Sequence, residues 1–158
     1  HTVNPINLFV QQSLFGGNGS DTILGNSGSD VIFGGTSNDQ LEGQGGNDEL
    51  FGEGGADDLS GGSGNDTLDG GLGTDQLTGG TGANKFIFSN NFGNDTATDF
   101  LVNVDQADFS SFSNINSFSD WLAASSDVGS DVVTTSGANS VTFQGITLGS
   151  LDADDFIF

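Results

Sequence analysis

A period of nine residues runs without interruption from Gly16 to Ile87. The eight blocks read GGNGSDTIL, GNSGSDVIF, GGTSNDQLE, GQGGNDELF, GEGGADDLS, GGSGNDTLD, GGLGTDQLT and GGTGANKFI. The first position is always glycine, the sixth is aspartate except in the last block, and the eighth is always apolar. Three columns in register indicate a structural repeat and overturn the alternative of disorder, which abundant Gly, Ser, Asn and charge would otherwise favour.

Each block predicts a tight turn followed by a short strand. Strand side chains alternate, so an apolar eighth position between mostly polar neighbours points inward. Glycine at the first, often the second and usually the fourth position permits the positive φ angles and close backbone approach that the turn needs. Two blocks are needed to enclose a core, so they form one coil of about 18 residues. The sequence therefore predicts an all-β fold, a parallel β-roll of about four coils.

The composition requires stabilisation by something other than a large apolar core. Only 33% of the residues are hydrophobic, and 22 acidic residues face a single Lys85, for a net charge of −21. This charge argues against nucleic acid as a partner, and no apolar run is long enough for a transmembrane segment. Cysteine is absent, which excludes disulfides and thiolate metal sites. Oxygen ligands for a hard cation remain.

The sixth-position column predicts two stacks of carboxylates. Residues 18 apart lie in adjacent coils at the parallel-strand spacing of about 4.8 Å. One edge of the roll would carry Asp21, Asp39, Asp57 and Asp75, and the other Asp30, Asp48, Asp66 and Asn84. Two bare carboxylates at that spacing repel by roughly 1 kcal/mol in water and about 3 to 4 kcal/mol at an effective dielectric near 20. A divalent cation between the two carboxylates makes their interaction energy favourable.

Carbonyl oxygens of the turns would complete a shell of six to eight oxygens, which suits Ca²⁺ better than zinc or magnesium. Adjacent stacked pairs give up to about six calcium sites, and the Asp66/Asn84 pair is expected to be the weakest because Asn84 is neutral. Ser37, which replaces a fourth-position glycine, is expected to distort the turn that carries Asp39. The predicted turn ligands are Gly16, Gly19, Gly25, Gly28, Gly34, Gly43, Gly46, Gly52, Gly55, Gly61, Gly64, Gly70 and Gly73.

The blocks resemble the RTX, or haemolysin-type calcium-binding, repeat G-G-x-G-x-D-x-U-x over residues 16–87. This resemblance implies a right-handed β-roll with calcium in its turns, disordered in the low-calcium cytosol and folded outside a bacterial cell. Two functions follow from it. One is calcium-triggered folding that supports secretion and stability of a larger protein. The other is an extracellular carbohydrate- or surface-binding module similar to alginate epimerase R-modules, with a neutral or calcium-bridged polysaccharide as ligand because Lys85 is the only cation.

Residues 88–158 hold five glycines but 9 of the 14 phenylalanines. Alternating runs at 131–135 and 140–143 predict strands, and 119–124 predicts a short helix. We expect a β-rich cap over the end of the roll, with residues 1–15 as a lead-in strand. The region with Asp95, Asp99, Asp105 and Asp108 resembles the one that follows the repeats in serralysin-type proteases. These acids either bind one more calcium ion or are solvated loop residues.

The last eight residues, LDADDFIF, resemble an uncleaved type I secretion signal, and they also fit a plain terminal strand. The first residues lack an initiator Met and an export signal, so we expect a fragment or a processed product that uses the type I secretion apparatus. His1 is the only histidine, which excludes Ser/His/Asp and Cys/His nucleophile systems. We therefore predict a non-catalytic module, with any enzyme upstream in the parent protein.

Overall fold

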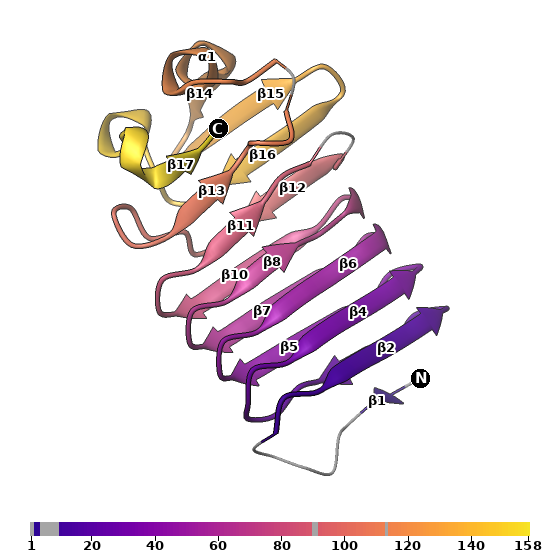
Figure 1. Cartoon of the computed structure of the whole chain (residues 1–158). Coiled ribbons are helices and arrows are strands. Elements are labelled where there is room, and N and C mark those ends of the chain that lie inside the picture. Colours follow the sequence, from indigo (N-terminus) through magenta and orange to yellow (C-terminus); the bar gives the residue numbers. More distant parts are fainter. Residues whose placement is uncertain (1, 4–9, 90–91, 113) are drawn as a thin grey trace.

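The computed structural model describes residues 2–3, 10–89, 92–112 and 114–158, and they form a β-solenoid of about six turns. Two sheets run along its length (Figure 1). Sheet A contains, in order, β1 (Thr2–Val3), β3 (Thr22–Leu24), β5 (Gln40–Gly45), β7 (Asp58–Ser63), β10 (Gln76–Thr81), β12 (Asn94–Ala97), β16 (Asn139–Phe143), β15 (Asp131–Ser136) and β14 (Ser125–Val128). Sheet B contains β17 (Phe156–Ile157), β13 (Gln106–Asp108), β11 (Lys85–Ile87), β8 (Thr67–Asp69), β6 (Glu49–Gly55), β4 (Val31–Thr36) and β2 (Ser13–Asn18), and β9 (Leu72–Gly73) pairs with β6.

The predicted parallel β-roll is confirmed. Within the repeats each strand pairs in parallel with the strand 18 residues further on, as Leu41 with Leu59 in sheet A and Ile32 with Leu50 in sheet B. The eighth-position side chains from Ile23 to Phe86 have no exposed surface. Full burial of such a side chain is worth about 1.5 to 3 kcal/mol. The inward columns therefore form a narrow, continuous core between the sheets.

The solenoid extends beyond the four predicted coils, because residues 88–158 continue both sheets before they close the end. Strands β12 and β16 pair in parallel after β10, and β13 and β17 pair in parallel after β11. Among the described residues the antiparallel pairs are β14 with β15 and β15 with β16. The expected cap is thus partly a prolongation of the roll. The expected helix is α1 (Phe118–Ala124), and two 3-10 helices, η1 (Leu148–Ser150) and η2 (Ala153–Asp155), follow.

An aromatic cluster fills this end of the roll. Alanine replaces the larger apolar residues of the inward columns at Ala97 and Ala107. Phe100 lies here with its ring 5.7 Å from that of Phe86 and 5.0 Å from that of Phe143. Trp121 of α1 is fully buried against Phe156 of β17, with ring centroids 4.2 Å apart. The closing helix and the C-terminal strand are therefore fixed by the same core.

The turns accommodate every departure from the glycine pattern. The fourth-position glycines have positive φ angles, and Ser37 adopts the same region with φ of 82°. The expectation that Ser37 distorts its turn is wrong, because the backbone N–H of Asp39 still donates to Asp57 Oδ1 at 2.8 Å. At the second position Asn26, Gln44 and Glu53 also have φ of 70° to 75°. A left-handed residue is strained but is held there by the coils on either side.

Three phenylalanines form a ladder on the outer face of sheet B. Phe15, Phe33 and Phe51 stack in successive coils with ring centroids 5.0 Å apart and nearly parallel planes. Their ring faces contact one another, and Phe15, at the end of the ladder, is 63% exposed. Of the predicted lead-in strand, residues 2–3 form β1 and residues 13–15 begin β2, whereas residues 1 and 4–9 lie outside the described part of the chain. None of the helices among the described residues is long and apolar enough to cross a bilayer.

Candidate metal centre

The sixth-position aspartates form a hydrogen-bonded ladder along each edge of the roll. On the first edge the backbone N–H of each aspartate donates to Oδ1 of the aspartate 18 residues later, through Asp21, Asp39, Asp57 and Asp75, at 2.7 to 2.8 Å. On the second edge the same bonds join Asp30, Asp48, Asp66 and Asn84 at 2.7 to 3.0 Å. The predicted stacking of residues 18 apart is therefore present on both edges.

Both ladders continue into the region without repeats, which the sequence pattern did not show. Asp75 N–H donates to Asp95 Oδ1 at 3.0 Å, and Asn84 N–H donates to Asp105 Oδ1 at 2.7 Å. The spacings are 20 and 21 residues, so a search for the nine-residue period does not detect Asp95 and Asp105. The sequence did contain a signal for them, because Gly93 and Asn103 lie two residues before an aspartate, as the fourth-position glycines do in the repeats. Both residues have positive φ angles in the structure. With Asp95 and Asp105 each edge has four stacked pairs.

In seven of the ladder carboxylates one oxygen lacks a hydrogen-bond partner. Oδ1 accepts the backbone hydrogen bond, whereas Oδ2 is buried without any hydrogen-bond donor at Asp30, Asp39, Asp48, Asp57, Asp66, Asp75 and Asp95. These side chains are at most 4% exposed. A buried carboxylate oxygen without a donor is strongly unfavourable unless a cation lies against it. The ladder geometry therefore favours positive charge between the coils.

The first-position glycines leave the space that a cation needs. A Cβ atom at Gly43 would lie 2.3 Å from Asp48 Oδ2 and 2.6 Å from the carbonyl oxygen of Gly61, one coil later. The same two kinds of oxygen flank Gly16, Gly25, Gly34, Gly52 and Gly61, at 2.4 to 2.9 Å. These first-position glycines do not have positive φ. Glycine is required here because carboxylate and carbonyl oxygens converge on the place of its missing side chain.

The donor set fits calcium. Among the described residues no three His, Cys, Asp or Glu side chains gather closely enough to hold a metal by themselves. We call the space between two stacked side chains of a ladder a gap. Backbone carbonyls therefore have to supply most ligands in each gap, next to the two carboxylates. Calcium accepts six to eight oxygens, including backbone carbonyls, in irregular geometry, whereas magnesium demands a near-ideal octahedron and zinc prefers nitrogen or sulfur. Calcium bound in a gap would neutralise the adjacent carboxylates.

The side chain of Asn84 differs from its neighbours in one atom. Its Oδ1 accepts the Asp66 N–H, so its Nδ2 is buried without an acceptor where the aspartates have Oδ2. A Cβ at Gly79 would lie 2.6 Å from this nitrogen. In the blocks before it, the carboxylate Oδ2 at this place lies near the first-position carbonyl oxygen of the next coil. The amide therefore weakens calcium binding in the gap between Asn84 and Asp105. The gap between Asp66 and Asn84 keeps both Asp66 Oδ2 and the Gly79 carbonyl oxygen as ligands.

Burial perturbs the protonation of the ladder in the absence of metal. Desolvation raises the pKa of Asp48 to about 6, that of Asp57 to about 7 and that of Asp95 to about 8, with repulsion from the neighbouring ladder carboxylates added to it. Burial also raises the pKa of Asp39, Asp66, Asp75 and Asp105. The metal-free roll therefore binds protons at a pH at which the unfolded chain is ionised.

We expect the metal-free chain to gain β-structure as the pH falls from 8 to 5.5. Because these pKa values lie above the unfolded value near 3.9, protonation stabilises the folded state at low pH, and this stability is lost as pH rises through 6 to 8. Far-UV circular dichroism in EDTA at the two pH values measures the change, and light scattering checks for association near the pI. An unchanged spectrum would show that the folded ladder carboxylates do not bind protons in this range.

The four acids suggested as one additional site do not gather. Asp95 lies on the first edge and Asp105 on the second. Asp99 accepts the backbone N–H groups of Gly79 and Gly80, both at 2.8 Å. Asp108 forms an ion pair with Lys85; burial alone would raise its pKa, but the Lys85 hydrogen bond and charge lower it below the usual value. One shared calcium site for these four acids is therefore wrong.

A second ladder, which the sequence analysis missed, lies at the fifth position. Asn38, Asn47 and Asn65 accept the backbone N–H of Ala56, Asn65 and Ala83, respectively, at 2.9 to 3.0 Å. The bonds join residues 18 apart, as in the aspartate ladder. Small polar residues in this column were the available signal. These amides hold the outer part of each turn in register beside the metal gaps.

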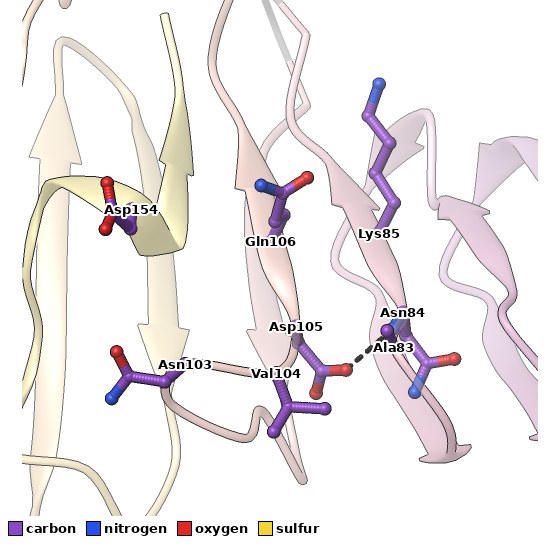
Figure 2. A pocket seen from close by; sticks show the side chains of 8 residues that line it. All are labelled: Ala83, Asn84, Lys85, Asn103, Val104, Asp105, Gln106 and Asp154. Atoms are coloured by element: carbon purple, nitrogen blue, oxygen red, sulfur yellow. Dashed lines mark hydrogen bonds between the residues drawn. The ribbon is translucent and has the colours of Figure 1, made fainter.

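A polar cavity of about 360 Å³ lies at the end of the second edge. Figure 2 shows the Asp105 carboxylate bonded to the backbone of Asn84, with Asn103 on one side and Asp154 of the C-terminal segment beyond it. The backbone N–H of Asn103 donates to Asp155 Oδ1 at 2.6 Å. Asp155 of the C-terminal segment is thus hydrogen-bonded to the last turn of this edge.

Comparison with known protein families gives one match, to the RTX calcium-binding nonapeptide repeat, over residues 15–50 and 51–86. Residues 15–86 are RTX repeats. The orphaned Oδ2 atoms of the RTX repeats lie in the column that carries the aspartate of the repeat pattern, so the family's calcium chemistry agrees with the donor set. A comparison with curated proteins gave no match.

Solved structures also resemble the RTX roll. The extracellular lipase LipA from Serratia marcescens matches with 18% identity and a TM-score of 0.64, over 94% of this chain and 38% of the lipase. At this identity the likeness shows the fold alone, and the chain spans less than half of the lipase. A subunit of the mannuronan C5-epimerase from Azotobacter vinelandii matches with 26% identity and a TM-score of 0.45, over 99% of this chain and 82% of that subunit.

Proposed function

We propose that the chain is a calcium-dependent folding module of a larger secreted bacterial protein. The observation that carries this proposal is the row of buried, unpartnered Oδ2 atoms on each edge of the roll, at Asp39, Asp57 and Asp75 on the first edge and at Asp30, Asp48 and Asp66 on the second. In this proposal residues 16–87 bind calcium through the sixth-position side chains and the turn carbonyls, residues 1–15 lead into the roll, and residues 88–158 close it. RTX repeats are typical of secreted bacterial proteins, which agrees with an extracellular site of folding.

The physical basis is a change in the sign of the electrostatic energy. Without calcium the excess of acidic residues opposes the compact state, and the unfolded chain keeps its carboxylates hydrated. Extracellular calcium modules bind with dissociation constants of about 0.1 to 1 mM. Cytosolic calcium lies far below that range, so the same chain would be unfolded inside the cell and folded outside. Metal binding and folding then become one event.

The variants Asp48→Asn and Asp30→Asn test this role on one edge. Asp48 has carboxylate neighbours in both adjacent coils, Asp30 and Asp66, whereas Asp30 stacks between Asp48 and Gln12. Asparagine keeps the Oδ1 acceptor, as Asn84 does naturally. We expect the calcium midpoint of folding to rise about tenfold for Asp48→Asn and about threefold for Asp30→Asn, which corresponds to roughly 1.4 and 0.7 kcal/mol. Equal midpoints in a calcium titration would contradict calcium binding between stacked pairs.

Support of type I secretion is the second part of the proposal. The segment that resembles a secretion signal forms η2 and β17, where Asp155 and Phe156 are buried. A secretion apparatus would therefore bind this segment before the chain folds. Export of the chain with and without residues 151–158 by a type I system tests this directly. Equal export of both would remove the secretion role and leave the calcium role intact.

Binding of a neutral polysaccharide is not supported by the exposed aromatic residues. Sugar rings stack on free aromatic faces, whereas both faces of Phe33 are covered by Phe15 and Phe51, and Phe33 covers one face of Phe15, which is 63% exposed. We therefore propose the calcium-dependent folding role rather than a carbohydrate-binding one. Retention of the calcium-loaded chain on immobilised neutral polysaccharide would reverse this choice.

A further inference from the structure

The last gap on the first edge lies between Asp75, in the last repeats that match the RTX family, and Asp95, which lies beyond the matched residues. The described part of the turn that carries Asp95, residues 92–95, repeats the backbone geometry of the turns before it. Gly73 and Gly93 form a parallel bridge, and Gly73 N–H donates to the carbonyl oxygen of Phe92 at 2.9 Å. A Cβ on Gly93 would lie 1.7 Å from the Gly73 carbonyl oxygen, as one on Gly73 would lie 1.5 Å from that of Gly55. From Phe92 to Asp95 the backbone therefore follows that of a repeat turn.

Two carboxylates meet in this gap with an unsatisfied oxygen each. The N–H of Asp75 donates to Asp95 Oδ1 at 3.0 Å, so the two side chains belong to adjacent coils. Asp75 is fully buried and Asp95 is 2% exposed. Oδ2 of both residues is buried without a hydrogen-bond donor. A pair of buried charges of like sign without a partner requires either protons or a cation.

A third acid distinguishes this gap from the others on the first edge. The residue before each first-edge turn is Phe15, Phe33 or Phe51 in the first three coils, and it is Asp69 in the fourth. Asp69 Oδ1 accepts the N–H of Gly71 at 3.1 Å, which holds the side chain beside the turn. Its negative charge adds to the rise in the pKa of both Asp75 and Asp95, after desolvation and their other contacts.

We propose that the gap between Asp75 and Asp95 is a calcium site at the end of the repeats, with one ligand beyond them, and that the charge of Asp69 makes it the tightest site of the first edge. The inference rests on the proposed calcium-binding function and assigns the site that fills first. Asp69 acts through its charge, because no three acids among the described residues can share one metal. Affinity for calcium rises with the negative charge around the site.

Three variants of the whole chain with the same change in charge test the proposal. Asp95→Asn removes a ligand but keeps the acceptor for Asp75 N–H. Asp69→Asn removes only the nearby charge, and Asp58→Asn, at an exposed position in β7, is the matched control. Calcium bound per chain is counted by equilibrium dialysis, and the affinity of the first ion is measured by calorimetry.

We expect Asp95→Asn to bind one ion fewer than the wild type and to lose the tightest step, with the first affinity falling about tenfold. Asp69→Asn should bind the same number with a first affinity about fivefold weaker, the effect expected of a unit charge on a divalent ion through water. Asp58→Asn should change neither. An unchanged ion count and first affinity in Asp95→Asn would overturn the proposal while the calcium function stands. A wild-type chain that binds no calcium would overturn both.

Discussion

Removal of calcium at pH 7.5 is expected to convert the β-roll into a largely unfolded chain. At 10 mM calcium, a site with a dissociation constant of about 0.1 to 1 mM stabilises the fold by about 1.4 to 2.7 kcal/mol. Summed over several of the stacked pairs, this equals the whole stability of an ordinary domain, about 5 to 15 kcal/mol. The narrow core between the sheets does not replace such a contribution.

Far-UV circular dichroism of EDTA-treated protein during a calcium titration measures this change. A cooperative transition from coil to β-structure is expected between sub-millimolar and millimolar calcium. Magnesium is the control, since it dehydrates reluctantly and fits an irregular shell of carbonyls poorly. A β-rich spectrum already present in EDTA at pH 7.5 would refute calcium as the agent of folding.

The variant Gly64→Ala is expected to prevent calcium-dependent folding, or to raise its midpoint by more than tenfold. A Cβ at Gly64 would lie 1.6 Å from the carbonyl oxygen of Gly46, and its φ of 136° lies in a region that only glycine occupies readily. The coils are held at the strand spacing by the ladders on both sides, so they cannot separate locally. A strained backbone with a clash against a neighbouring main chain costs more than about 3 kcal/mol.

Gly129→Ala is the matched control for this variant. Gly129 also has a positive φ, 71°, but a Cβ there meets nothing within 4 Å. Its cost is expected to be about 1 kcal/mol, from the left-handed backbone alone. Calcium titrations and thermal melts of both variants separate close approach from backbone conformation. Equal effects would mean that contact between the turns does not limit the roll.

The repeats were predictable because their contacts recur with one period. The pairing of Leu41 with Leu59 and the bond from Asp48 to Asp66 both follow from a shift of 18 residues. The end of the roll does not share this property. Asp95 and Asp105 join the ladders after 20 and 21 residues, since their turns are longer while the half-block from the fourth position onward is kept.

The strands that close the solenoid depend on contacts without a local pattern. Ser140 pairs with Asn94 across 46 residues, and Phe156 pairs with Ala107 across 49. These registers are set by the aromatic core around Trp121 and Phe143, which no periodicity describes. The orientation of each carboxylate was also beyond the sequence. The column of aspartates indicated a cation, but only the structure separates the bonded Oδ1 from the buried Oδ2.

The shift of 18 residues gives the roll a translational symmetry along its axis. A segment such as residues 34–51 meets the same neighbours on both sides as the coil before or after it, through the ladders and the inward columns. Deleting or duplicating one whole coil therefore requires no new packing solution, whereas a change of nine residues would exchange the two sheets. Adding or removing one coil of 18 residues would thus add or remove one stacked pair on each edge.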